Sequence, residues 1–253
     1  MSDYPEIAER FARETAEHEM QVLHDDGPYR HLKFTNPGRR WAYWFELITV
    51  PGALIFRGDG ESFVFSRVPD MFEFFRWGVW KDGSLHINPH YWSEKLTSNR
   101  ECVMKYDQDS FERQVKEYVV EAIQGRSAPR GISRAIKYML ENGDITGEGG
   151  ARRELEEFEY RLYEASCSCG ASQSFSDDLD ASEWTYRHAR EAGSQHRTSV
   201  KPGPAFLFED TWEWSFKDFD WWFLWACRAI VWGIQQYDAA KAAATPDEQA
   251  VTA

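Results

Sequence analysis

The stretch from His24 to Arg76 constrains the fold most, because it is a series of short apolar runs separated by turn residues. Polar and apolar residues alternate within the runs, which predicts strands with one buried face. Tight turns such as Pro51-Gly52 join them, so we predict a small antiparallel meander. Asp70 then begins an aromatic helix that is expected to cover the apolar face. The predicted strands are 30–34, 41–48, 54–56 and 62–66.

The remainder of the chain is mainly helical by its apolar spacing. Three glycines within 147–150 are a hinge candidate, and 166–203, rich in Ser, Gly, His and Asp, is expected to be mobile in part. The fold class expected is therefore α+β: a small antiparallel β-meander covered by helices, with a mainly helical C-terminal half. The predicted helices are 7–20, 110–124, 132–142, 155–165, 182–192 and 218–237.

The domain organisation predicted from these elements has three parts. Residues 1–125 form an α+β domain with the meander, and 126–242 form a mainly helical region packed on it or continuous with it. Residues 243–253 lack any apolar pattern and are expected to be a disordered tail.

Composition limits the classes of protein that fit. The net charge of −13 argues against direct nucleic-acid binding and favours a basic partner surface or simple solubility. The sequence has no charged-then-apolar leader and no run of about 18 apolar residues, so we expect neither secretion nor a membrane span. Its four cysteines are then expected to be reduced thiols, in the cytoplasm.

Part of the chain resembles a family of uncharacterised bacteriophage and prophage proteins over about 22–97. The resemblance implies a phage or prophage origin, in which case the location is the host cytoplasm, and it assigns no chemistry to any residue. The matching strings are HDDG at 24–27, YRH at 29–31, WFELIT at 44–49, PG at 51–52, GD at 58–59, FSR at 65–67 and DMFEFFR at 70–76, with 87–89 and 91–92 continuing it.

The first candidate site is the group His24, Asp25, Asp26, His31 and Asp59, with Glu46 close by if the meander folds as predicted. Imidazole and carboxylate groups together suit Zn²⁺, Mn²⁺ or Fe²⁺ and can activate water for hydrolysis. The alternative is architectural, because Asp-Asp-Gly is also a common turn before a strand.

The second candidate site is Cys167-Ser168-Cys169, with His188 and His196 downstream. Two thiolates and two imidazoles can complete a tetrahedral zinc site. However, the single residue between the cysteines and the wide spacing of the histidines differ from common zinc motifs. Ordinary loop cysteines are the alternative reading, and the pair is not the Cys-x-x-Cys of redox proteins.

Tryptophans mark a candidate interaction surface. Trp221, Trp225 and Trp232 lie on one side of the helix 218–237 with Arg228, opposite an ordinary apolar face, so this helix is either central or in contact with a partner. Just before it, Trp212 and Trp214 lie among acidic residues. That mixture fits a sugar-cleaving site, a surface for Arg-rich partners, or a helix N-terminus beside the core. The acidic residues are Glu209, Asp210, Glu213, Asp218 and Asp220.

Basic residues gather at one further place, the helix pair 110–124 and 132–142, which has helix–turn–helix order but no diagnostic turn. They are Arg126, Arg130, Arg134 and Lys137.

We therefore expect a non-enzymatic acidic interaction protein that binds a host macromolecule, in counter-defence or host takeover. One alternative is a metal-dependent hydrolase or nuclease at the first candidate site. The other is a structural component that self-associates through the tryptophan face.

Overall fold

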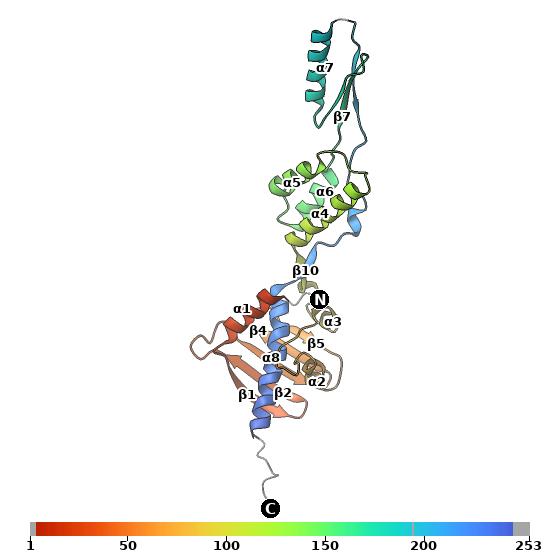
Figure 1. Ribbon diagram of the computed structural model, residues 1–253. Helices are drawn as coiled ribbons and strands as arrows, with labels where there is room; N and C mark the ends of the chain where they lie inside the picture. Colours follow the sequence, from red (N-terminus) through yellow and green to blue (C-terminus); the bar gives the residue numbers. More distant parts are fainter. Residues whose placement is uncertain (1–3, 194, 245–253) are drawn as a thin grey trace, which may run out of the picture. The chain divides into compact units, whose positions relative to one another are not determined.

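The computed structural model describes residues 4–193 and 195–244, and it has the predicted α+β fold. The chain divides into two compact units (Figure 1): unit 1 comprises residues up to Lys105 and from Phe219 onward, and unit 2 is Tyr106–Asp218. The chain passes between them at β6 (Met104–Tyr106) and β10 (Lys217–Phe219), two strands that pair with each other.

This division differs from the predicted boundary at residue 125. The helix α4 (Gln108–Gln124) belongs to unit 2, and the last helix, α8 (Trp221–Ala244), returns to unit 1. The predicted helix 218–237 thus exists, but it belongs to the apolar core of unit 1. The predicted tail 243–253 lies outside the described residues from 245 onward, while 243 and 244 belong to α8.

The meander of unit 1 is confirmed, with strand order β1-β2-β3-β4-β5 and every neighbouring pair antiparallel. The predicted type II turn between β3 and β4 is supported by Gly52, whose φ is +85°. The strands are β1 (Glu19–Asp26), β2 (Tyr29–Thr35), β3 (Phe45–Val50), β4 (Ala53–Gly58) and β5 (Phe63–Phe65).

The strand β1 is an addition to the predicted sheet. The helix α1 (Pro5–Thr15) ends earlier than the predicted 7–20, and the chain pairs with β2 from Glu19 onward. His24, Asp25 and Asp26 therefore lie in a strand rather than in a turn. The turn follows at Gly27, whose φ of +59° suits glycine.

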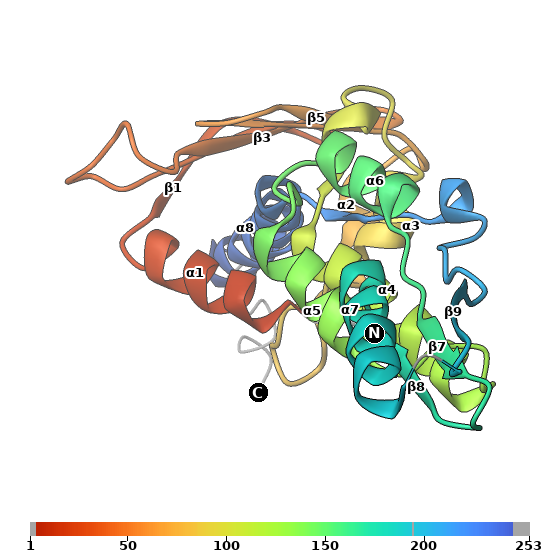
Figure 2. The same ribbon diagram turned by 90° about the horizontal axis from the view of Figure 1, so that it is seen from above.

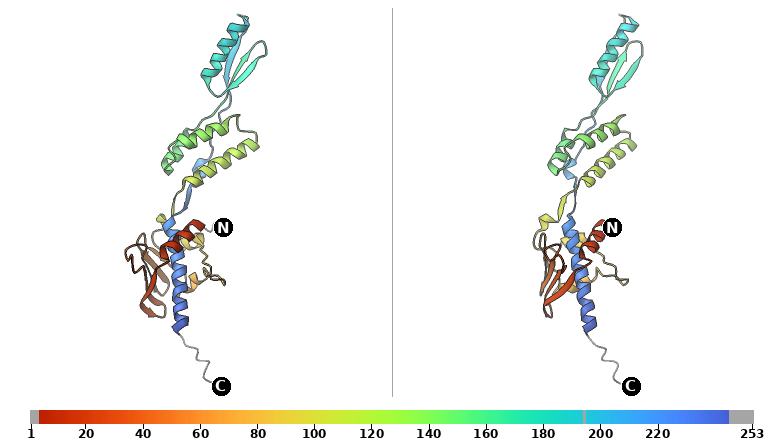
Figure 3. Two further views of the ribbon diagram at one scale, coloured as in Figure 1. Left: turned by 60° about the vertical axis from the view of Figure 1, so that its left-hand side comes forward. Right: turned by 90° about the vertical axis from the view of Figure 1, so that its left-hand side faces the viewer.

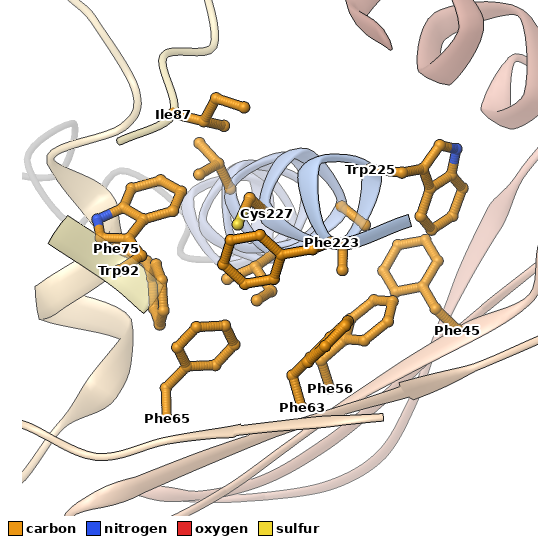
Figure 4. Close-up of a cluster of buried hydrophobic side chains, with 14 of the residues drawn as sticks. Phe45, Phe56, Phe63, Phe65, Phe75, Ile87, Trp92, Phe223, Trp225 and Cys227 are labelled. Atoms are coloured by element: carbon orange, nitrogen blue, oxygen red, sulfur yellow. The ribbon is translucent and has the colours of Figure 1, made fainter. Parts of the chain in front are cut away.

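One face of the sheet is lined by aromatic rings, as the alternation predicts. The rings of Phe34 and Phe45 stack at 4.5 Å between centroids, and Phe56 continues the row on β4. Figure 2 shows α1 and α8 on the same side of the strands. Figure 4 shows the phenylalanine side chains of the sheet pointing toward α8.

The helix α8 is the centre of unit 1 and runs along the sheet (Figure 3). Most of its residues from Trp222 to Tyr237 are buried, because the sheet and α1 both pack on it and α2 (Met71–Arg76) contributes Phe72 against Tyr237. At Gly233 the helix lies so close to the sheet that an added Cβ would be 2.8 Å from Cδ1 of Leu47.

The short helix α2 begins where the sequence predicts it. The carboxylate of Asp70 accepts a hydrogen bond from the backbone amide of Phe72 and two more from the guanidinium of Arg30, at 2.9 and 2.8 Å. The buried Arg30 side chain therefore has its counter-charge. Farther along, α3 (Pro89–Ser93) is capped by Asn88 in the same way.

Unit 2 begins with three helices around a separate apolar core that includes Phe111, Ile136 and Leu155. These helices are α4, α5 (Ile132–Asn142) and α6 (Glu148–Glu157). The hinge predicted at 147–150 is wrong, because Gly149 and Gly150 lie inside α6. A side chain at Gly150 would meet the carbonyl oxygen of Asp144 at 2.2 Å, so close packing explains that glycine.

The remainder of unit 2 contains what we call the ββαβ lobe, residues 163–202. Its strands form an antiparallel sheet of order β8-β7-β9, and its helix α7 contacts this sheet (Figure 1). The predicted helix 182–192 is thus confirmed, although it begins four residues earlier. The elements are β7 (Tyr163–Cys167), β8 (Ser172–Phe175), α7 (Asp178–Ala192) and β9 (Thr198–Pro202).

Candidate metal centre

Two cysteines are presented by the tight turn between β7 and β8. Cys167 is the last residue of β7, and Cys169 follows two positions later on the exposed turn. The turn closes because the amide of Gly170 donates to the carbonyl of Cys167, and Gly170 has a φ of +92°. Glycine adopts that conformation without steric cost, so the turn brings both sulfur atoms to one side.

Two histidines lie at the same end of the lobe as this turn. His188 lies in the last part of α7, which ends at Ala192 and has Gly193 as its C-cap, and His196 lies between the helix and β9. Beyond it, the amide of Ser168 donates to the carbonyl of Arg197, and the amide of Arg197 donates to the Ser168 hydroxyl. These two bonds hold the start of β9 against the cysteine turn.

The four side chains converge as ligands of one ion would. Sγ of Cys167 lies 3.3 Å from Nδ1 of His196, and Sγ of Cys169 lies 3.3 Å from Nε2 of His188. All four ligand atoms lie within 4.8 Å of one another. Zn–S and Zn–N bonds of about 2.3 and 2.0 Å at tetrahedral angles place ligand atoms roughly 3.3–3.8 Å apart, so the two 3.3 Å contacts match zinc and the widest separation would close by about 1 Å around the ion.

The electrostatics of the cluster favour the thiolate form that a metal needs. Burial works against ionisation of Cys167, but the backbone amide of Cys169 and the side chains of Cys169, His196 and His188 outweigh it. Together they lower the pKa of Cys167 to about 6. A thiolate is therefore present at neutral pH, ready to bind a soft or borderline cation.

An aromatic ring orients one of the ligands. The indole of Trp184 stacks on the imidazole of His188, with 4.9 Å between centroids and planes 7° apart. Stacking of this kind restricts the rotation of the imidazole and so keeps Nε2 directed at the cluster.

The lobe has almost no hydrophobic core to hold it together. Among its described residues, only Ala165, Cys167 and Ala181 are buried, and none of them belongs to the apolar clusters of the two units. Units of about 40 residues usually need a metal, a disulfide or a partner for stability. A zinc ion held by these four side chains would supply such a link between the β7–β8 turn, α7 and β9.

The comparisons with known proteins add no assignment. No protein-family model, curated protein or solved structure matches the chain. The functional conclusion therefore depends on the residues of this chain and their arrangement.

The first candidate site does not assemble. His24 and His31 are neighbours across β1 and β2, and Nε2 of His31 bonds to Glu46 at 3.0 Å. Asp25 is engaged elsewhere, by the hydroxyl of Tyr237 at 2.8 Å and the ammonium of Lys241 at 2.6 Å. Asp26 is exposed opposite Tyr29, and Asp59 accepts the amide of Tyr43. Within the described residues, the Cys-His group is the one cluster with metal-binding geometry.

The predicted tryptophan surface on α8 is largely internal. Trp225 is fully buried, Arg228 is 7% exposed, and Trp232 packs on Phe34 and Phe11. These three cannot form a partner surface in this fold, because α8 is covered by α1 and the sheet. Only Trp221, at the start of the helix, remains exposed.

The acidic and aromatic segment before α8 is divided between the units. Trp212 is exposed in unit 2, and Trp214 packs against Tyr118 and Phe208 in the core of that unit. Asp220 belongs to unit 1, where it pairs with Lys105 at 2.7 Å.

No helix within residues 4–193 and 195–244 is long and apolar enough to cross a membrane.

The structure brings together the four side chains of the second candidate site, although their spacing in the sequence differs from common zinc motifs. The spacing of His188 and His196 is unusual because only His188 lies on α7, whereas His196 follows the end of the helix. A helical spacing rule therefore does not apply to this pair.

Proposed function

We propose that the protein is a zinc-binding interaction protein, in which a structural zinc ion holds the ββαβ lobe in a form that binds a partner. The observation that carries the proposal is the convergence of Cys167, Cys169, His188 and His196, with all ligand atoms within 4.8 Å. Two cysteines and two histidines are a common set for structural zinc.

The ligand set supports a structural rather than a catalytic metal. Four protein ligands fill the tetrahedral shell of zinc, whereas catalytic zinc sites keep one position for water or substrate. Two thiolates also neutralise the charge of the ion, which reduces its strength as a Lewis acid. Binding is therefore the function that this geometry favours over hydrolysis.

The exposed side of the lobe supports a role in binding. Leu179 and Tyr186 on α7 are 78% and 71% exposed, seven positions apart and so on one face of the helix. Large exposed apolar side chains that share a face are typical of contact surfaces. Because residues 22–97 resemble phage proteins, the partner that we propose is a host macromolecule.

The test is the metal content of the purified chain, measured by elemental analysis after expression with zinc. We expect one zinc ion per chain, and loss of the ion in both Cys169→Ser and His188→Ala. The matched controls are Cys102→Ser, a free cysteine in unit 1, and His24→Ala, from the first candidate site. Both controls should keep their zinc.

Two results would contradict the proposal. If the chain bound no zinc even after reconstitution under reducing conditions, the proposed structural zinc site would be wrong. A metal that survives His188→Ala but is lost in His24→Ala would instead support the metal-dependent hydrolase.

A further inference from the structure

Unit 1 has a pocket of about 490 Å³ with aromatic walls. It lies between the start of α8, the loop that precedes β3 and the turn between β4 and β5. The rings of Trp41, Tyr43, Trp221 and Trp222 line it, together with the carboxylates of Asp59 and Glu61. Its volume is within the usual range of ligand sites, about 300–1,000 Å³.

The pocket is built by close packing at its base. Nε1–H of Trp222 donates to the carbonyl of Glu61 at 2.9 Å, and the ring lies so near Gly60 that an added Cβ would be 2.6 Å from its Cε2 atom. Trp222 also stacks on Trp225 with 4.9 Å between centroids. The turn that carries Asp59 and Glu61 is thereby fixed against the core.

A second fixed element is the backbone at Tyr43. Its φ of +54° is unusual for a bulky residue, and the strained conformation is held from two sides. The amide of Tyr43 donates to Asp59 at 3.1 Å, and its carbonyl contacts Nε2 of His18 at 2.9 Å. The loop that presents Trp41 is therefore preorganised.

The chain's own arginine shows what the aromatic wall accepts. The guanidinium carbon of Arg10 lies 3.7 Å from the ring centroid of Trp221, the geometry of a close cation–π contact. Arg10 also bonds to Glu14 at 2.9 Å, so its charge is already balanced outside the pocket. The ring of Trp221 thus binds a guanidinium group whose counter-charge comes from Glu14 and not from the carboxylates of the pocket.

The second cation of the pocket is likewise balanced. Lys105 pairs with Asp220 at 2.7 Å, and Glu61 adds a longer-range contribution to its raised pKa. Neither Asp59 nor Glu61 forms an ion pair with any part of the chain that the structure describes. Trp41, which lines the same pocket, is 78% exposed.

We propose that this pocket binds an arginine side chain of a basic protein partner. The guanidinium would stack on Trp41 and donate hydrogen bonds to Glu61 and Asp59, a combination that its planar fork allows. The net charge of −13 favours the approach of such a partner. The inference rests on the proposed role in partner binding but not on the metal.

The experiment measures binding of a capped peptide with two arginines separated by glycine, by calorimetry at two salt concentrations. The same peptide with lysine is compared, because an ammonium does not stack in the same way. We expect Trp41→Ala to weaken arginine-peptide binding about tenfold, which corresponds to about 1.4 kcal/mol. Glu61→Gln should weaken it about threefold, and the lysine peptide should bind more weakly to the wild type.

Matched controls separate the pocket from general attraction of a cation to an acidic protein. Trp77→Ala removes another exposed tryptophan, and Glu73→Gln removes one charge elsewhere on unit 1. Both should bind the peptide as the wild type does. Equal weakening by Glu61→Gln and Glu73→Gln, or no effect of Trp41→Ala, would overturn the proposal.

Two further measurements complete the test. Binding of a neutral oligosaccharide that depends on Trp41, with no arginine-peptide binding, would also overturn it and indicate a sugar site. The zinc-deficient variant His188→Ala should keep peptide binding. Failure of the metal proposal is thereby distinguished from failure of the pocket, since zinc content and peptide affinity are measured separately.

Discussion

The Sγ atom of Cys169 lies 3.3 Å from Nε2 of His188, although the residues are 19 positions apart in the chain. One is on an exposed turn and the other is near the end of a helix. Together with the equivalent pair Cys167 and His196, this contact joins α7 and the segment before β9 to the turn between β7 and β8, at one end of the ββαβ lobe. In a lobe with almost no apolar core, these two pairs add side-chain links to the strand pairing and to the contacts of α7 with the sheet.

Removal of the metal should unfold the lobe selectively. A chelator is expected to abolish hydrogen-exchange protection in 163–202, because structural zinc contributes about 10–16 kcal/mol of binding free energy in comparable small units. The strands and α8 of unit 1 have their own core and should keep their protection. Protection of 163–202 that is unchanged after the metal is removed would show that the lobe folds without it.

The ion pair of Arg30 and Asp70 should contribute strongly to the stability of unit 1. Asp70→Ala is expected to lower the free energy of unfolding by about 3 kcal/mol, because the buried Arg30 loses its counter-charge and α2 loses its cap. Urea unfolding followed through unit 1 measures the change. Glu94→Ala breaks the exposed pair with Lys95 and should cost less than about 1 kcal/mol. Equal effects of the two substitutions would contradict the expectation.

The same pair predicts a dependence of stability on acid. Burial raises the pKa of Asp70, but hydrogen bonds from Arg30 and from the amide of Phe72 outweigh it and place the pKa below its ordinary value of 3.8. Because the folded pKa is depressed, the contribution is complete above about pH 3.8 and is lost as pH falls through the lower folded value. Unfolding curves of the wild type and Asp70→Ala should therefore converge below pH 3.8. A constant difference down to pH 2 would be inconsistent with this assignment.

Close packing of α8 on the sheet can be tested at Gly233. Gly233→Val should destabilise unit 1 by about 2 kcal/mol or more, because the new side chain would meet Leu47 and Phe34, which are fully buried and cannot move aside. Thermal unfolding measures the effect. Gly149→Ala is the control, since no atom lies within 4 Å of its added Cβ, and it should be neutral or stabilising by up to about 1 kcal/mol.

The central position of Trp225 predicts loss of stability rather than a change of assembly. Trp225→Ala should cost about 3–5 kcal/mol, because a fully buried indole and its hydrogen bond to Glu14 are removed. Trp212→Ala, at an exposed site, should change stability by less than about 0.5 kcal/mol. If Trp225→Ala instead left stability unchanged and shifted the elution volume in size exclusion, that result would support self-association through the tryptophan face, as the sequence allowed.

The sequence by itself determined the local structure and much of the fold class. Alternation of apolar residues predicted the meander, and Asp70 and Gly125 marked where helices begin and end. Glycine and asparagine also identified the turns, as at Asn36, whose side chain accepts the amides of Gly38 and Arg39. Such features depend on residues close in the chain, so their physical causes can be read from neighbouring positions.

The tertiary structure decided which distant residues meet. The sequence allowed α8 to be central or to face a partner, and only the packing of α1 and the sheet on both its sides settled that question. The sequence also offered two candidate metal sites, one of histidines and carboxylates and one of cysteines and histidines. Pairing of β1 with β2 directed Asp25 to Tyr237 and Lys241 and so dispersed the first, whereas the fold of α7 over the β7–β8 turn assembled the second. Ligand geometry is set by contacts between segments remote in the chain, and composition and spacing do not encode those contacts.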